Sequence, residues 1–360
     1  MDNSVSLFVY IISDWLGLVS LASCIGVLVC LLWVLAPPRG DALSGLRSLL
    51  AGMWRLLGIA IAALFASNII GLLVRAAEMS GKPFPGVLPV LPTVVFRTHL
   101  GHVWIIRMAA LVVLSVTMVA ARRSPRSLPS SYLMLGCALL LSATESASGH
   151  ASDAGDFSVP EIMDWLHLLG PMVWGGGLLV LSAVILPRLV QEGDRAAGSM
   201  AGVAARFSRI AGVAVALIAL TAVYQAWAYV SVEALVRSPY GRTLIAKVVL
   251  FSLLLGLGAF NRYIRVPRLQ EWAGSATTRR GVLGRIVAPV LLPLARDARG
   301  PLVAKQFTRS VKCEACLLLA VLLCAALLRH EIPPRHAPHL EHDASVMPGP
   351  WRPNDGARLP

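Results

Sequence analysis

Residues 161–186, with the sequence EIMDWLHLLGPMVWGGGLLVLSAVIL, decide the fold of this 360-residue chain. A helix needs about 20 mostly apolar residues to cross the hydrocarbon core of a membrane, and this stretch supplies them without a lysine or an arginine. Further mostly apolar runs occur at residues 14–36, 54–74, 101–121, 131–148, 208–230, 242–263 and 311–329. The sequence therefore predicts an all-α, polytopic membrane bundle of about eight transmembrane helices.

The composition agrees with a membrane protein and excludes several other classes. Hydrophobic residues make up 56% of the chain and charged residues only 14%, whereas a soluble domain has about 25% charged residues. The mean hydropathy of +0.71 argues against a water-soluble enzyme. The six cysteines lie mostly within apolar runs, which argues against a secreted disulfide scaffold. No ATP-binding, zinc-protease, nucleophile-elbow or haem-attachment motif occurs, so we expect neither an enzyme nor an ATP-driven pump.

The basic residues predict the orientation of the bundle. The formal net charge is +13, and the arginines concentrate in alternate connections, at residues 37–55, 122–130, 187–209 and 264–310. Lysine and arginine accumulate in cytoplasmic loops, so this pattern needs no nucleic acid partner. It places both chain termini on the periplasmic side.

Two segments outside the spans have a character of their own. Within the basic 264–310 connection, Val282–Ala295 is apolar but too short to cross the membrane, and we interpret it as an interfacial or re-entrant segment. The tail at residues 333–360 is rich in histidine, proline and charge. That composition predicts a mostly disordered periplasmic segment.

The two halves of the chain resemble each other, which indicates a parallel four-plus-four repeat with halves at residues 1–150 and 151–332. Asp-Trp-Leu opens the first run at residues 14–16 and the fifth at 164–166. Arg-Thr-x-x-Gly at residues 97–101 precedes Arg107, and Arg-Ser-x-x-Gly at residues 237–241 precedes Lys247. Parallel repeats of this kind occur in membrane transporters.

His167 is the main candidate for a metal ligand. It follows Asp164 by three residues and precedes Trp174 by seven, so the three side chains share a helix face. Ionisable groups at membrane depth usually face the bundle interior. A neutral imidazole is a good copper ligand, and a carboxylate can orient it. His150, beyond the fourth run, can converge on His167; the alternative is a histidine that only bonds a neighbouring helix. Gly175–Gly177 predict close helix packing.

Weaker candidates carry metal-binding chemistry with ordinary alternatives. His99 and His102 share a helix face, Met163 offers a thioether, and Cys313-x-x-Cys316 offers two thiols at the start of the last run. The competing interpretations are that the histidines are simply exposed to solvent, that the methionine fills the core, and that the cysteines act as small apolar side chains.

Two charged residues within the apolar runs support these candidates. Glu314 and Lys247 can form a structural ion pair with each other, or Lys247 can extend to the interface. A proton or ion relay is the alternative role.

Several motifs together resemble those of the copper resistance D (CopD) membrane proteins. The first is His167-Leu168-Leu169 followed by Trp174-x-Gly176-Gly177, which is similar to the HLL…WxGG signature of that family. The others are Gly149-His150-Ala151, Arg206-Phe207-Ser208, Ser238-x-Tyr240-Gly241 with Leu244 and Lys247, Asn261-Arg262, Glu314 and Pro333-Pro334. The resemblance covers residues 148–334.

The resemblance implies a multi-pass inner-membrane protein that moves copper ions, Cu(I) or Cu(II), between periplasm and cytoplasm, with no nucleotide. It further implies His150 and His167 as ligands and a small periplasmic copper-binding (CopC-like) partner. A homo-oligomer in the lipid bilayer is also compatible with it. A membrane redox protein that binds b-type haem or quinone is the alternative function, although His167 has no obvious transmembrane histidine partner for haem. A scaffold subunit without metal is a third possibility.

Overall fold

The structure is a computed structural model that describes residues 3–35, 43–82, 85–122, 127–149, 155–229, 238–275, 282–294 and 300–331. Within these ranges every regular element is helical, which confirms the all-α prediction. The long helices are α1 (Asn3–Val29), α2 (Leu43–Ser80), α4 (His99–Ala121), α5 (Leu128–Ser146), α6 (Val159–Val180), α8 (Ala197–Tyr229), α10 (Pro239–Phe260) and α13 (Pro301–Leu328). The short ones are η1 (Cys30–Val34), η2 (Leu88–Val90), α3 (Leu91–Arg97), η4 (Leu181–Ile185), α7 (Leu186–Gln191), η5 (Gly193–Ala196), η6 (Asn261–Arg265), α11 (Val266–Trp272), α12 (Val282–Leu291) and η7 (Leu292–Leu294).

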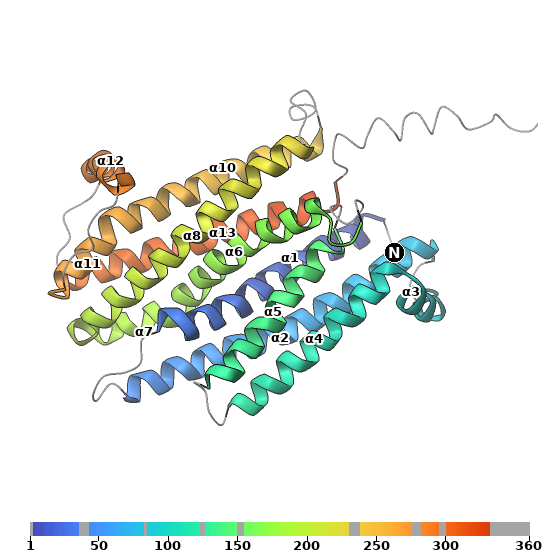
Figure 1. Cartoon of the computed structure of the whole chain (residues 1–360), viewed down its shortest axis with the longest axis horizontal. Coiled ribbons are helices and arrows are strands. Elements are labelled where there is room, and N and C mark those ends of the chain that lie inside the picture. Colours follow the sequence, from blue (N-terminus) through green and yellow to red (C-terminus); the bar gives the residue numbers. More distant parts are fainter. Residues whose placement is uncertain are drawn as a thin grey trace, which may run out of the picture.

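The long helices lie side by side as a polytopic bundle (Figure 1). Seven helical stretches in the described part of the chain are long and apolar enough to cross a membrane, and they coincide with seven of the predicted runs. The run at 131–148 corresponds to α5, which has 19 residues but is not among these seven. A helix of that length measures about 28 Å, close to the thickness of a bilayer core, and α5 packs along α4.

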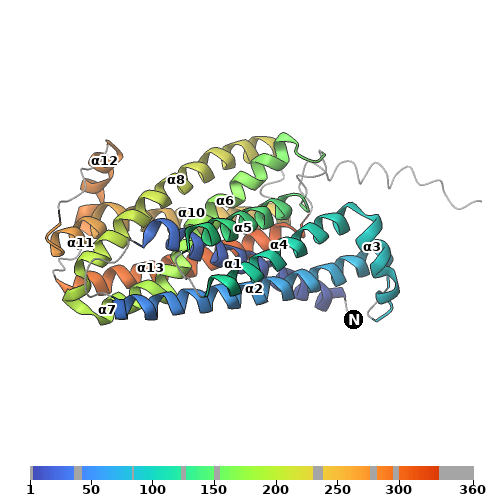
Figure 2. The same cartoon turned by 60° about the horizontal axis from the view of Figure 1, so that its bottom comes forward.

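The bundle has two chemically distinct ends (Figure 2). We call the end that carries α7, α11 and α12 the basic end, because Arg188, Arg262 and Arg265 lie in its short helices. We call the opposite end, near α3, the network end, because the ion pairs of Glu145 with Arg107 and Arg329 lie there. These described arginines belong to connections predicted to be cytoplasmic, and they lie at the same end of the bundle.

Helices α1 and α6 cross at two glycines in the centre of the bundle. A Cβ atom on Gly26 would lie 2.1 Å from the carbonyl carbon of Gly176, and one on Gly176 would lie 1.9 Å from the carbonyl oxygen of Ala22. No side chain fits at either position, so the backbones touch directly. Gly175 and Gly177 likewise face Leu318 and Phe207. The predicted packing role of the glycine triplet is confirmed.

Paired features of the two halves support the predicted repeat. The Thr98 hydroxyl accepts the Gly101 N–H at the start of α4, and the Ser238 hydroxyl accepts the Gly241 N–H at the start of α10, each at 3.0 Å. The π-helical segments η1 and η4 follow the two central helices at equivalent places.

The two halves also anchor each other through equivalent tryptophans. The Trp15 indole donates to the Leu319 carbonyl in α13 at 3.0 Å, and the Trp165 indole donates to the Ser142 hydroxyl in α5 at 2.9 Å. Each central helix is therefore attached to the last helix of the other half.

Helix α12 lies outside the main bundle at the basic end (Figure 1). Its ten residues cannot span a bilayer. The side chains of Val282, Leu283, Ile286 and Val290 are all more than 60% exposed. This exposed apolar face supports the predicted interfacial interpretation of the segment.

Candidate functional site

His167 lies half-buried on the third turn of α6 and faces α8. Its Nδ1 is 3.0 Å from the Thr221 hydroxyl, and that hydroxyl donates its proton to the Leu217 carbonyl at 2.7 Å. This contact orients the ring, and in the tautomer with the proton on Nδ1 the ring donates to the hydroxyl oxygen. Nε2 then carries a lone pair, as a metal ligand requires. The same hydrogen bond also fits the alternative of a purely structural histidine.

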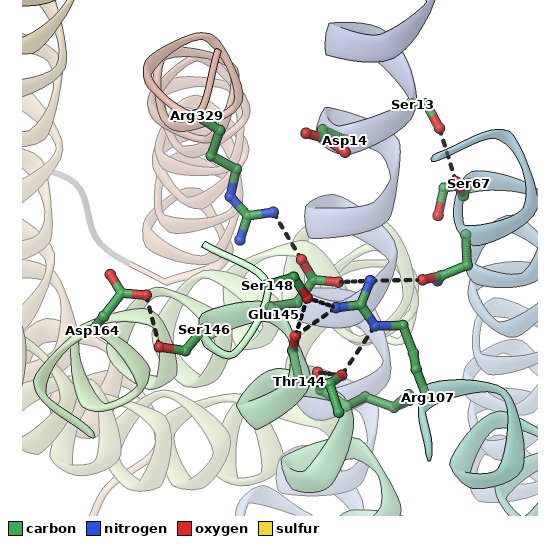
Figure 3. A network of polar contacts seen from close by, with 12 residues as sticks. Ser13, Asp14, Ser67, Arg107, Thr144, Glu145, Ser146, Ser148, Asp164 and Arg329 are labelled. Carbon is green, nitrogen blue, oxygen red and sulfur yellow. Dashed lines mark hydrogen bonds and ion pairs between the residues drawn. The ribbon is translucent and has the colours of Figure 1, made fainter. Parts of the chain in front are cut away.

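Asp164, one turn before His167, is held by neutral donors from two helices. The Gln225 amide of α8 donates to Oδ1 at 3.1 Å, and the Ser146 hydroxyl of α5 donates to Oδ2 at 2.9 Å. Figure 3 shows Asp164 and Ser146 pointing toward each other. The carboxylate is thus fixed between α5, α6 and α8.

Lys247 of α10 belongs to the same group of side chains. It is half-buried, and Phe251, one turn beyond it on α10, packs edge-on against Trp174, two turns beyond His167 on α6, so Lys247 lies on the face of α10 toward α6. The described residues therefore bring together a carboxylate, an imidazole and an ammonium group from α6 and α10. The supporting role of Asp164 and Lys247 stays a prediction.

Glu314 does not pair with Lys247, contrary to one of the sequence alternatives. It is 3% exposed, and the Asn261 amide donates to its carboxylate. Arg265 orients that amide by donating to the Asn261 Oδ1 at 2.9 Å. Helices α10 and α13 run antiparallel, and Asn261 lies 14 residues beyond Lys247, which corresponds to about 21 Å along a helix. The acid therefore belongs to the basic end, far from Lys247.

Trp174 lies seven residues beyond His167 on α6 and is 3% exposed. Its ring packs edge-on against Phe251 with 6.2 Å between centroids. A Cβ on Gly258 would lie 3.3 Å from Trp174 and 3.9 Å from the Glu314 carboxylate. Trp174 thus separates the level of His167 from the level of Glu314.

The weaker histidine and methionine candidates are not gathered into a metal site. His99 Nε2 lies 3.3 Å from the Ala147 carbonyl and 3.7 Å from Asp156, with about half of its side chain exposed. His102 is exposed and Met163 is half-buried. Within the described ranges, no three His, Cys, Asp or Glu side chains are close enough to hold a metal ion together. His150 lies outside the described residues.

The CxxC pair does not lie at the start of its helix, as the sequence indicated. α13 begins at Pro301, so Cys313 and Cys316 lie well inside it. Charged residues end the apolar run near 311, but intrahelical hydrogen bonds extend the helix regardless of polarity. Both thiols are exposed while Glu314 between them is buried. They therefore face away from the polar groups of the bundle interior.

A buried ion network at the network end was missed by the sequence analysis (Figure 3). The Glu145 carboxylate of α5 lies 3.2 Å from Arg107 of α4 and 2.8 Å from Arg329 at the end of α13. Arg107 also donates to Asn68, Thr144 and Ser148. The sequence did contain a signal for this network: Arg107 lies inside the apolar run 101–121, and Glu145 lies inside the adjacent run 131–148.

The residues that end α13 connect it to three other helices. Arg329 contacts Glu145 of α5, His330 Nε2 lies 3.0 Å from the Asp14 carboxylate of α1, and Glu331 accepts from Thr243 of α10 at 3.2 Å. Burial alone would lower the pKa of the Arg329 guanidinium, but the carboxylates of Glu145 and Asp14 raise it above its ordinary value. Arg329 is therefore a permanent cation at this end.

Comparisons with known proteins agree with the geometry of a polytopic membrane bundle. Residues 1–158 match the family model described as "Copper resistance protein D-like, N-terminal domain", and residues 201–292 match "Copper resistance protein D". The chain is 32% identical over 213 residues to copper resistance protein D of Pseudomonas syringae pv. tomato, covering 57% of this chain and 66% of the relative.

Two further relatives each match about half of the chain. Copper transport protein CutJ of Bacillus subtilis (strain 168) is 29% identical over 188 residues, which cover 51% of this chain and 34% of that protein. Inner membrane protein YebZ of Escherichia coli (strain K12) is 23% identical over 208 residues, covering 56% of this chain and 69% of that protein. The matches therefore span just under two thirds of the Pseudomonas relative and about a third of the Bacillus one. No solved structure matches the chain.

Proposed function

Because the chain belongs to the copper resistance protein D family, we propose that it handles copper ions in a bacterial inner membrane. Copper enters at the network end, which faces the periplasm, and leaves at the basic end, which faces the cytoplasm. The arginines at the basic end support this orientation. The first half, residues 1–150, acts as scaffold, and the second half, residues 151–332, carries the copper site.

The state of the His167 ring is the observation that carries this proposal. In this proposal the ring donates its Nδ1 proton to the Thr221 hydroxyl, 3.0 Å away, and Nε2 keeps its lone pair for a soft or borderline cation such as copper. A hydrogen bond from the second ring nitrogen is the usual way in which proteins orient a metal-ligating histidine. A ring turned toward lipid would have had no such partner.

His150 is the second ligand of the proposal. Helix α5 ends at Ser146, whose hydroxyl contacts Asp164, one helical turn from His167, and the described chain continues to Gly149. His150 is the next residue. A small periplasmic copper-binding protein of the CopC type would deliver the ion to this end. The chain carries no ATPase motif, so we propose that import follows the copper gradient or is coupled to another one.

Metal analysis of the purified protein tests the proposal. We expect His167→Ala to lower copper affinity by about 10- to 100-fold, the range seen when the surroundings of a metal ligand are disturbed. Copper uptake into proteoliposomes should fall in parallel. His102→Ala is the matched control, because this histidine is exposed at the start of α4, and it should behave as wild type.

Two results would contradict the proposal. Equal copper content in wild type and His167→Ala would remove the site. A strong Soret band in the visible spectrum would instead support the haem-binding alternative.

A further inference from the structure

The repeat places a cation at the same turn of two equivalent helices. Arg107 is nine residues beyond the capping Thr98 of α4, and Lys247 is nine residues beyond the capping Ser238 of α10. Both caps have the same geometry, with 3.0 Å between the hydroxyl and the capped glycine N–H. Each cation therefore lies at the same turn of its own helix, about two and a half turns beyond the cap.

The two cations differ in what surrounds them. Arg107 has a carboxylate of its own, since its guanidinium lies 3.2 Å from Glu145 and also donates to Asn68 and Thr144. Asp164, one turn from His167, is the carboxylate on the facing side of α6, because the contact of Phe251 with Trp174 (6.2 Å between ring centroids) sets Lys247 within about one turn of the height of His167. The charge of Lys247 therefore acts directly on the surroundings of the imidazole.

We propose that Lys247 is a specificity-determining residue, whose positive charge makes the site at His167 selective for monovalent Cu(I) over divalent cations. This inference rests on the proposed function, because it assumes that a metal ion binds at His167. In this proposal Lys247 does not bind the metal ion. It acts on the ion through its positive charge.

The physical reason is the balance of charges around the ring. Asp164 and Lys247 together carry no net charge, so an incoming ion meets a neutral imidazole rather than an anionic site. The repulsion by the ammonium group scales with the charge of the ion, so a divalent cation experiences twice the repulsion of a monovalent one. The low dielectric constant inside the bundle reduces the screening by water.

Removing the ammonium group should therefore change selectivity more than affinity. In Lys247→Met the Asp164 carboxylate remains without its cation and attracts every metal ion, but a divalent ion twice as strongly. We expect the ratio of Zn(II) to Ag(I) affinity to rise by about tenfold or more. Lys247→Arg keeps the charge and should keep the wild-type ratio.

Equilibrium dialysis of the full-length protein in detergent measures these affinities, with Ag(I) as a redox-stable substitute for Cu(I) and Zn(II) as the divalent probe. Lys305→Met is the matched control, because Lys305 is exposed near the basic end of α13 and its loss should leave the ratio unchanged. If Lys247→Met does not fold, Lys247→Gln serves as the second neutral variant. A purely structural Lys247 would alter thermal stability without altering the ratio.

The outcomes separate this inference from the proposed function. If His167→Ala binds Ag(I) as tightly as wild type does, the metal site itself is refuted. If His167→Ala loses Ag(I) binding while the neutral Lys247 variants keep the wild-type ratio, only the selectivity role is overturned. A higher Zn(II) to Ag(I) ratio in the neutral variants, restored in Lys247→Arg, supports it.

Discussion

Replacing Glu145 by glutamine should destabilise the bundle strongly, because one carboxylate neutralises two buried arginines. Its oxygens lie 3.2 Å from Arg107 and 2.8 Å from Arg329, and the three side chains are between 14% and 30% exposed. Removing one partner of a buried ion pair costs about 3–5 kcal/mol. We expect about 3 kcal/mol for Glu145→Gln, at the lower end of that range, because Arg329 is the most exposed of the three.

Thermal unfolding in detergent measures this loss, and we expect a midpoint about 5 °C below that of wild type. Glu192→Gln is the matched control, because Glu192 is exposed at the basic end and its loss should have little effect. The double variant Glu145→Gln/Arg329→Gln should recover part of the stability, since one of the uncompensated cations is also removed. A Glu145→Gln protein as stable as Glu192→Gln would refute the reasoning.

Two further substitutions test the packing and the ligand geometry. Gly176→Ala should lower the unfolding midpoint by several degrees, because its Cβ would lie 1.9 Å from a backbone oxygen; Gly136→Ala, with nothing within 4 Å of its Cβ, should not, and equal midpoints would contradict the helix crossing. Thr221→Val removes the hydroxyl that lies 3.0 Å from Nδ1 of His167, and it should weaken copper binding by about tenfold in equilibrium dialysis with little change in the unfolding midpoint. Unchanged affinity would show that this hydrogen bond does not orient a ligand.

The helices were predictable because the membrane imposes a simple rule on their length and polarity. Each apolar run marks a helix, since an unpaired backbone polar group is too costly in hydrocarbon. The triplet Gly175–Gly177 predicted close packing for the same kind of reason, because only glycine allows backbones to touch. The start of α13 at Pro301 was not predictable, because a helix that continues beyond the hydrocarbon no longer needs apolar residues.

Part of the candidate site was also predictable. The spacing of Asp164, His167 and Trp174 along α6 follows from helical periodicity alone. Their partners do not, because Thr221 and Gln225 come from α8, more than 50 residues away. The same limit explains Lys247, which faces Asp164 rather than Glu314. Which residues of α10 and α13 meet depends on the relative register of two antiparallel helices.

The sequence by itself determined that this chain is a bundle of membrane helices with arginines concentrated in alternate connections, because burial of backbone and charge in hydrocarbon is a local requirement that each segment meets alone. Only the tertiary structure decided that Gly26 meets Gly176, that Glu145 joins Arg107 to Arg329, and that Thr221 holds the His167 ring. These contacts depend on helix register and rotation. Both are set by the packing of all neighbouring side chains together, which no single segment encodes.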